Sequence, residues 1–399
     1  MLREIELWRA VAGDTGLLQR AGSLDPSDVS AVAALRRDND SDAVSVALRL
    51  VEARAKAARK FGELGKGLIA DVPGVEQASG ARVAAYKAGR VAQALGNGGL
   101  VVDLCCGIGG DSMALVDAGL DTVCVDRDPL RVWMATNNTS QRIQGVCADV
   151  RSLALDGKAV HIDPARRNES TGRRAWRLED YQPGSAFIGR LIDSAPAVAI
   201  KLSPGVDLQA LPWPGEVEFI SEAGRLVQAL LWTGGFVQTA RRATLIDSGG
   251  IYQLAGEATP PAYQAPQRYL YTFDAAVERA GLIGQLSTLL DAPAIHPKLG
   301  LLTSNTLTTS PWIDGFELIE RLPWRPKRIK RWLAANDGGL VEIKTRGKAC
   351  DPDTEQRRLR GGGSTTYTVF VLRFDTKVQA LMTKRIALTE PRCYASQAV

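Results

Sequence analysis

The sequence predicts an α/β protein with a mostly parallel sheet in the middle of the chain, helices before it and a mixed α+β region after it. Residues 1–95 are rich in Ala, Leu, Arg and Glu, and their apolar residues recur near helical spacing. From residue 100 onward, short apolar segments alternate with helix-like segments, which is the pattern of βαβ units. After residue 267, strand-like and helix-like segments are mixed without that alternation.

Two breaks separate these three parts of the chain. The segment GNGG, residues 96–99, ends the helical pattern, and the proline-containing segment GEATPPAYQAP, residues 256–266, indicates a linker. A chain of 399 residues is long enough for two or three domains that each bury a core. We therefore predict an N-terminal helical domain at 1–95, a central domain at 96–255 and a C-terminal α+β domain at 267–399.

The composition argues against several classes of protein. No segment approaches the roughly 18 consecutive apolar residues of a membrane span, and Glu4 and Glu6 argue against a secretory signal. None of the six cysteines forms a CxxC pair, so neither a zinc site nor a disulfide framework is expected. We expect a cytoplasmic protein that binds neither metal nor membrane.

The central region contains a series of predicted strands. The apolar segments are LVVDLC, TVCVD, VCADV, AVHID and AVAIKLS, with helix-like segments such as DSMALVDAG and PLRVWMATNN between the first of them. This alternation predicts parallel strands. The later segments VEFIS, RLVQALLW and ATLID follow with little helix between them, so we expect antiparallel strands at one edge of the sheet.

The strongest local signal is VVDLCCGIGGDS, residues 101–112, in which a strand leads into a glycine turn and then a helix. Glycines let the backbone approach a ligand, and the start of the helix adds free N–H groups. Gly107 and Gly109 match the first two glycines of the dinucleotide pattern GxGxxG, but Ser112 stands at the third. Asp103, just before the turn, would repel a pyrophosphate, so a ligand with a positive charge is favoured.

Acidic residues also follow the next three predicted strands. Asp126 ends the second strand, where a carboxylate accepts hydrogen bonds from ribose hydroxyls; Asp149 follows the third strand, and Asp163 ends the fourth. Taken singly, Asp103 is also interpretable as a core acid, Asp126 as a helix cap and Asp149 as a loop acid. Together they indicate a binding site at the edge where the carboxyl ends of parallel strands meet.

The order DLCCGIGG, VCVDRD, VCADV, HIDPARR resembles that of the class I S-adenosylmethionine-dependent methyltransferases. Four further segments make the chain similar, more narrowly, to bacterial methyltransferases with a THUMP-like C-terminal domain: EQASGARVAAYKAGR, DPARR, KLSPGVD and VEIKTRG. The resemblance implies a Rossmann-like core that binds S-adenosyl-L-methionine and a C-terminal α+β domain of THUMP-like fold.

The resemblance also implies which residues contact the cofactor. They lie in the glycine turn and after the second and third strands: Asp103, Gly107 and Gly109 at the methionine part, Asp126 at the ribose, and Asp149 with Val150 at the adenine. Glu76 and Gln77, by the same resemblance, fold over the cofactor site. From the sequence alone, those two residues are equally well interpreted as a helix cap.

Asp163 and Pro164 are the catalytic candidates. They match the place where related enzymes carry Asp/Asn-Pro-Pro-Tyr or Asp-Pro-Pro-Arg, a motif that accepts hydrogen bonds from the target nitrogen in amino-methylating relatives. Ala165 and Arg166 stand where the second proline and the aromatic residue would be, so the stacking ring is absent. Lys201 ends the fifth predicted strand near the same edge, where it is placed to contact substrate or to pair with an acid.

A cluster of arginines directly follows Asp163. Its members are Arg166, Arg167, Arg173, Arg174 and Arg177, with Trp176 among them. Arginines bind phosphates through paired hydrogen bonds, and a tryptophan stacks on bases, so we predict that this segment lines the entrance for an RNA substrate. The alternative is a solvated loop whose arginines pair with Glu169, Glu179 and Asp180.

A second basic cluster, RLPWRPKRIKRW, lies in the C-terminal region. Residues 321–385 contain 16 Lys and Arg against 6 Asp and Glu, an asymmetry typical of a surface that binds a polyanion. The predicted RNA contacts in this cluster are Arg325, Lys327, Arg328, Lys330 and Arg331. The alternative interpretation is a solvated helix face.

These observations favour an S-adenosylmethionine-dependent methyltransferase that acts on RNA, on tRNA or rRNA, at a base nitrogen positioned by Asp163. A methyltransferase for a small molecule or a protein is the nearest alternative. An NAD-linked oxidoreductase is disfavoured by Asp103 and by the missing third glycine, and a non-catalytic RNA-binding protein by the retained acids. The sequence does not indicate an oligomeric state.

Overall fold

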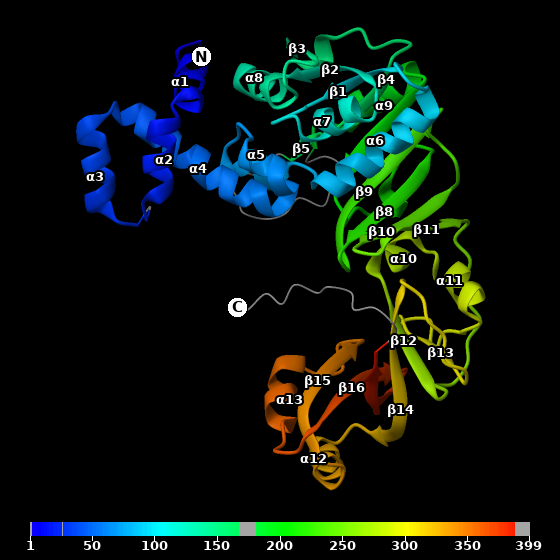
Figure 1. Ribbon diagram of the computed structural model, residues 1–399. Helices are drawn as coiled ribbons and strands as arrows, with labels where there is room; N and C mark the ends of the chain where they lie inside the picture. The colour runs from blue at the N-terminus through cyan, green and yellow to red at the C-terminus, as the bar shows by residue number, and fades with distance from the viewer. Residues whose placement is uncertain (1, 26, 167–180, 388–399) are drawn as a thin grey trace. The chain divides into compact units, whose positions relative to one another are not determined.

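The computed structural model describes residues 2–25, 27–166 and 181–387 (Figure 1). The chain divides into two compact units, one of Met1–Glu216 with Gln228–Gln238 and one of Val217–Val227 with Thr239–Val399. The three-domain boundaries predicted from the sequence stay a prediction. Within the described ranges, no helix has both the length and the apolar character that crossing a membrane requires.

The N-terminal part of the first unit is helical, as predicted. Its elements are α1 (Leu2–Gly13), α2 (Thr15–Ser23), α3 (Val29–Asp38), α4 (Ser41–Phe61), the 3-10 turn η1 (Gly62–Lys66), α5 (Val72–Gln77) and α6 (Ala81–Leu95). Aspartates begin several of these helices, because a carboxylate accepts hydrogen bonds from the free N–H groups of the first turn. Asp14 caps α2, Asp28 caps α3 and Asp40 caps α4 in this way.

The central sheet of the first unit is parallel. Its strands are β1 (Leu100–Leu104), β2 (Asp121–Asp126), β3 (Gln144–Cys147), β4 (Ala159–Ile162) and β7 (Ala197–Leu202), in the spatial order β3-β2-β1-β4-β7. The intervening helices are α7 (Gly110–Asp117), α8 (Pro129–Asn138) and α9 (Ser185–Ser194), and a two-stranded ribbon joins β5 (Ala165–Arg166) to β6 (Tyr181–Gln182). The predicted βαβ pattern is therefore confirmed.

Four strands extend the sheet beyond β7. They are β8 (Glu216–Glu222), β9 (Arg225–Gly234), β10 (Arg241–Asp247) and β11 (Gly250–Gly256), and the full order is β11-β10-β8-β9-β7-β4-β1-β2-β3. β9 runs antiparallel to β7, as expected, and β10 runs antiparallel to β11, a strand that was not predicted from the sequence. The expectation was wrong for β10 and β8, which are parallel. Both edges of β9 are already occupied, so β10 pairs with β8 instead of its neighbour in sequence.

The C-terminal part of the second unit forms another sheet, of order β13-β12-β14-β17-β16-β15. Its elements are β12 (Tyr269–Phe273), α10 (Ala275–Ala280), α11 (Ile283–Leu290), β13 (Leu302–Ser304), β14 (Ile313–Pro323), α12 (Pro326–Ala335), β15 (Gly338–Arg346), α13 (Pro352–Leu359), β16 (Thr365–Phe374) and β17 (Lys377–Ile386). Ile329 and Leu333 of α12 and Leu359 of α13 share one apolar core with β15, β16 and β17.

A buried ion pair joins α6 to the start of β8. The guanidinium of Arg90 donates to Glu216 Oε1 at 2.9 Å and to Oε2 at 3.0 Å, and it lies 4.2 Å from the ring centroid of Trp232. Both charged side chains are almost fully buried. Removing one partner of such a pair is strongly destabilising, because the other charge then stays buried without compensation.

Replacing Arg90 by methionine leaves the Glu216 carboxylate buried without its cation. We expect Arg90→Met to lower the free energy of unfolding by about 3–5 kcal/mol, measured by urea or thermal unfolding. The matched control is Arg142→Met, which breaks an ion pair with Asp117 whose side chains are 49% and 56% exposed. The control should cost less than about 1 kcal/mol. Equal losses in the two variants would contradict the structural role assigned to Arg90.

Candidate functional site

The glycine turn after β1 leaves open space above its backbone. Gly107 has a φ of +56°, and a Cβ built there would meet no atom within 4 Å. A ligand is therefore able to approach the main chain closely at Gly107. Gly109, with a φ of +83°, differs, because a Cβ there would lie 2.8 Å from the Cα of Ala135 on α8. The glycine at that position makes room for the neighbouring helix.

Strand register decides how far each acid stands from the edge of the sheet. Leu104 of β1 is level with Val125 of β2 and with Ile162 of β4. Asp126 and Asp163 each follow one of those two residues, so they lie one step beyond the level of Leu104. Asp103 lies one step before it, inside the strand.

The Asp126 carboxylate is arranged to accept hydrogen bonds from hydroxyl groups. Its Oδ2 accepts a hydrogen bond from the N–H of Gly107 at 3.1 Å, and its Oδ1 accepts one from the N–H of Asp128 at 3.0 Å. Burial raises the pKa of the Asp126 carboxyl, although these two N–H groups offset part of the effect. Each carboxylate oxygen has a further lone pair, so the group suits the two hydroxyls of a ribose.

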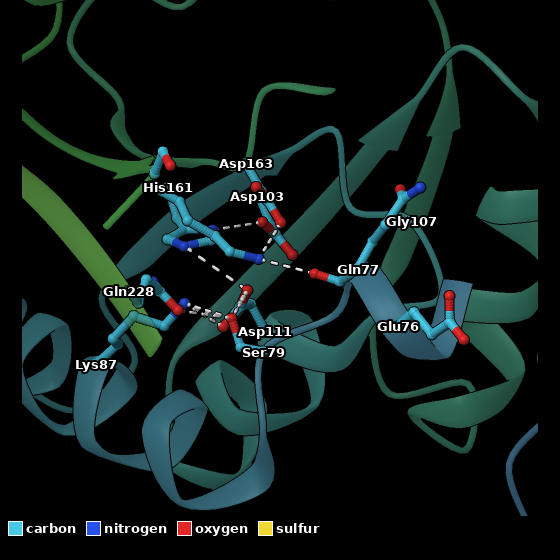
Figure 2. A network of polar contacts seen from close by, with 12 residues as sticks. Glu76, Gln77, Ser79, Lys87, Asp103, Gly107, Asp111, His161, Asp163 and Gln228 are labelled. Atoms are coloured by element: carbon cyan, nitrogen blue, oxygen red, sulfur yellow. Dashed lines mark hydrogen bonds and ion pairs between the residues drawn. The ribbon is translucent and has the colours of Figure 1, made fainter. Parts of the chain in front are cut away.

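Asp103 is buried, and its predicted contact with the methionine part of the cofactor stays a prediction. Its side chain is 1% exposed, and its two oxygens are engaged within the protein. Nδ1 of His161 lies 2.7 Å from Oδ1 (Figure 2). The hydroxyl of Ser112 donates to Oδ2. Ser112, the residue that breaks the GxGxxG pattern, is thus a partner of the acid, and His161 is a buried residue of β4.

A second buried group of polar side chains lies beside this one (Figure 2). Lys87 of α6 places its Nζ 2.6 Å from Oδ1 of Asp111, in the first turn of α7. Ser79, between α5 and α6, donates to Oδ2 of Asp111 at 3.0 Å and accepts from Lys87 at 2.9 Å. Burial alone would raise the pKa of Asp111, but nearby charges, Lys87 first among them, hold it well below its usual range.

The sequence analysis missed this group, although α6 contains a signal for it. Lys87 falls in the buried stripe formed by Val83, Ala84, Ala88 and Val91. A lysine is almost never fully buried unless it is paired, so its position implied an acidic partner. Nothing in the spacing identified that partner as Asp111.

Asp163 is held at the tip of β4 by its main chain and by its side chain. Its N–H donates to the carbonyl of Leu104 at 3.2 Å, and the following residue, Pro164, is buried. Its Oδ2 accepts a hydrogen bond from Nζ of Lys201 at 2.5 Å. The side chain remains 28% exposed, so Asp163 is accessible from outside the sheet.

Asp149 begins the short turn η2 (Val150–Ser152) after β3. Its side chain is exposed and forms an ion pair with Arg151 at 2.5 Å, whose hydrogen bonds lower the pKa of Asp149 to about 2. Val150 is buried. The structure therefore places an exposed acid and a buried apolar side chain next to each other at the end of the third strand.

Helix α5 packs directly against the glycine turn. A Cβ on Gly74 would lie 2.5 Å from Cγ2 of Ile108, so only glycine allows this approach. Asp71, which caps α5, forms a two-point ion pair with Arg131 of α8 at 2.7 and 2.8 Å. Asn138 of α8 also donates to the carbonyl of Ile108 at 2.9 Å. The segment that contains Glu76 and Gln77 is thereby held against the glycine turn and against α8.

Of the two predicted basic clusters, the structure describes the second in full and the first only in part. Arg166 is the second residue of β5, and Arg167, Arg173 and Arg174 lie outside the described residues, as does Trp176. The second cluster is described in full: Arg325, Lys327, Arg328, Lys330 and Arg331 are all exposed, at the start and along one side of α12. Among the described residues, no group of three or more His, Cys, Asp or Glu side chains is arranged to hold a metal ion.

Comparison with known proteins identifies the class to which this fold and site belong. Residues 314–385 match the family model described as THUMP domain-like. The chain is 35% identical over 338 residues to an uncharacterized S-adenosylmethionine-dependent methyltransferase of Mycobacterium tuberculosis strains CDC 1551 and H37Rv, covering 80% of this chain and 90% of that protein. A crystal structure from Porphyromonas gingivalis W83, named as a methyltransferase, shares the fold with a TM-score of 0.72 and 19% identity, covering 96% of this chain and 98% of that one.

The class is therefore that of the S-adenosylmethionine-dependent methyltransferases with a class I fold and a C-terminal THUMP-like domain. Within it, the chain belongs to the family of the mycobacterial methyltransferase. The predicted enzyme class and cofactor are confirmed, and an NAD-linked oxidoreductase is not supported. The residues present fit S-adenosylmethionine, since open backbone at Gly107 lies next to an Asp126 carboxylate with lone pairs left for a ribose.

The buried Lys87–Asp111 pair predicts a specific dependence of stability on pH. Because the folded state lowers the pKa of Asp111 below its value in the unfolded chain, about 3.9, the pair stabilises the fold above about pH 4. That contribution is lost as the pH falls further, through the pKa of the folded state. Asp111→Asn should cost about 3–5 kcal/mol of unfolding free energy at pH 7, and the difference from wild type should shrink below about pH 4.

The matched control for this substitution is Asp117→Asn, at the exposed end of α7. It should cost less than about 1 kcal/mol. Urea unfolding of the two variants and the wild type at a series of pH values measures both quantities. A cost of Asp111→Asn that stays constant down to pH 2 would contradict the assignment of a charged Asp111.

Proposed function

We propose that this methyltransferase modifies RNA, tRNA or rRNA, at a base nitrogen whose N–H donates a hydrogen bond to Asp163. The observation that carries the RNA part of the proposal is the exposed basic surface of α12, within the THUMP-like residues. The acceptor part rests on the partly exposed Asp163 carboxylate at the tip of β4.

Helix α12 is amphipathic: its apolar side packs into the core, and its basic side is exposed. Ile329 and Leu333 are buried in the core of the C-terminal sheet. Arg325, Lys327, Arg328, Lys330 and Arg331 are exposed, and none forms an ion pair with a residue that the structure describes. Cations without protein partners favour a polyanionic ligand, because binding releases counterions from its phosphates.

In this proposal, some of the predicted cofactor-binding residues contact the cofactor and the others support the glycine turn. Asp126 would hold the ribose, the open backbone at Gly107 would lie against the methionine part, and Val150 would pack on the adenine with Asp149 at its edge. Asp103 and Gly109 support the turn, one by its hydrogen bonds and the other by allowing contact with α8. When bound, S-adenosylmethionine supplies an electrophilic methyl group, so the protein contributes mainly position and orientation.

Asp163 would orient the methyl acceptor. A residue before proline is confined to extended backbone, and the hydrogen bond from the Asp163 N–H to Leu104 fixes the peptide on the other side of the same residue. The carboxylate is therefore presented in one orientation. An N–H held by such an acceptor keeps the nitrogen lone pair directed away from Asp163, and hydrogen bonding stabilises the charge that develops in transfer.

The most direct test incubates the purified protein with labelled S-adenosylmethionine and total cellular RNA and identifies the labelled nucleoside. We expect a base carrying a methyl group on nitrogen. Asp163→Ala should lower the transfer rate by about 100-fold or more, with the affinity for S-adenosylhomocysteine unchanged within about threefold. A wild-type rate in Asp163→Ala would show that the acceptor role is wrong.

The role proposed for the basic surface of α12 is tested by RNA affinity and its dependence on salt. The double variant Lys330→Glu/Arg331→Glu should weaken RNA binding by more than about tenfold and reduce the slope of log K against log salt by about 2. The control is Arg36→Glu/Arg37→Glu, the same change of charge on the exposed side of α3. Filter binding at several salt concentrations measures both, and equal losses would mean that net charge alone governs binding.

A cofactor-affinity measurement tests the role proposed for Asp126. Asp126→Ala should weaken the binding of S-adenosylhomocysteine by about 10- to 100-fold, because two hydrogen bonds to ribose hydroxyls are lost. Asp121→Ala, at the exposed opposite end of the same strand, should leave binding unchanged. Titration calorimetry gives both dissociation constants. Unchanged binding by Asp126→Ala would place the ribose elsewhere.

A further inference from the structure

We propose that Lys201 is a positioning residue for Asp163, and that the Lys201–Asp163 pair restricts the methyl acceptor to an uncharged N–H donor such as a nucleobase nitrogen. The inference rests on the proposed function in one respect, namely that Asp163 receives the acceptor. It goes further by assigning a role to Lys201 and by excluding cationic amines as acceptors.

Strand pairing brings the two residues together. β4 and β7 are parallel neighbours, with Ile162 level with Ile200, so Asp163 and Lys201 stand at the same height on adjacent strands. Nζ of Lys201 lies 2.5 Å from Oδ2 of Asp163, and the two side chains are 13% and 28% exposed. The lysine is thus the more buried partner, and the carboxylate is the part of the pair that an incoming molecule meets.

The contact fixes how the carboxylate is turned. Lys201 occupies Oδ2, while Leu104 and Pro164 restrict the main chain of Asp163. Oδ1 is then the oxygen directed to the acceptor. One oriented oxygen matches one N–H, and a fixed geometry is what an in-line transfer requires.

Lys201 has a second function in the geometry of the site. Its Nζ also donates to the carbonyl of Gln77 at 3.0 Å. Gln77 is the last residue of α5, where carbonyl groups have no partner inside the helix. Lys201 therefore joins the proposed catalytic acid to the segment that packs on the glycine turn.

The pair also sets the charge that an acceptor encounters. A lone carboxylate attracts cations, whereas a carboxylate 2.5 Å from an ammonium forms a pair with no net charge. The nearby Lys87 and Asp111 are themselves paired at 2.6 Å and add no net charge. Lysine and arginine side chains are protonated at pH 7, so Lys201 would repel them, while an amino group on a nucleobase is neutral.

Methyl transfer from S-adenosylmethionine to the acceptor nitrogen needs no further reactant. The nitrogen lone pair forms the new N–C bond, and the electron pair of the breaking S–C bond stays with sulfur. The proton released from the methylated nitrogen leaves through Oδ1 of Asp163 to solvent. Throughout, the role of Lys201 is to hold the carboxylate and balance its charge.

The test compares Lys201→Met, Lys201→Arg and wild type with labelled S-adenosylmethionine, offering total cellular RNA and, separately, poly-L-lysine. We expect Lys201→Met to lower kcat on RNA by roughly 10- to 100-fold, with KM for RNA and the Kd for S-adenosylhomocysteine within about threefold. Lys201→Arg, which keeps the charge, should recover part of kcat. Wild type should label RNA at nitrogen and leave poly-L-lysine unlabelled.

Four results would overturn the inference. They are an unchanged kcat in Lys201→Met, equal kcat in the Met and Arg variants, labelling of poly-L-lysine by wild type, and a methyl group on a ribose oxygen, which would make Lys201 a base for a hydroxyl. If Asp163→Ala is inactive while Lys201→Met has wild-type kcat, the present inference fails and the proposed function stands. If wild type labels no RNA, or Asp163→Ala retains the wild-type rate, the proposed function fails and the inference with it.

Discussion

The burial of the Asp103 carboxylate beneath the glycine turn is the constraint on which the rest of the site depends. A charged group away from water is tolerated only when its oxygens have hydrogen-bond partners, and here His161 and Ser112 provide them. His161 does so because β4 pairs with β1 at the same level, and Ser112 because α7 begins at Gly110. The position of the turn relative to the sheet follows from these contacts.

This arrangement gives the four acids two different roles. Asp103 and Asp111 are committed to protein partners, and the second of them, with Lys87 and Ser79, links α6 and α7 to the loop that follows α5. Asp126 and Asp163 stand one residue farther out on their strands and remain partly exposed. The buried acids support the turn, and in our proposal the outer ones receive the cofactor ribose and the methyl acceptor.

The sequence predicted much of this because strand periodicity and strand ends are local properties. The parallel strands and the positions of Asp126 and Asp163 at their tips follow from the apolar segments and the residues after them. The inward position of Asp103 did not follow, because it depends on a register with β4 that no local pattern specifies. For the same reason Ser112 looked like a mismatch, Lys87 had no visible partner, and β10 was expected to be antiparallel to its neighbours.

A crystal structure with S-adenosylhomocysteine tests most directly whether the acids divide in this way. We expect the ribose hydroxyls on Asp126, Oδ1 of Asp163 directed to the sulfur side of the ligand, and Asp103 still bonded to His161 and Ser112. A ligand ammonium bound directly by Asp103, with the contacts to His161 and Ser112 broken, would contradict the supporting role given to that buried carboxylate.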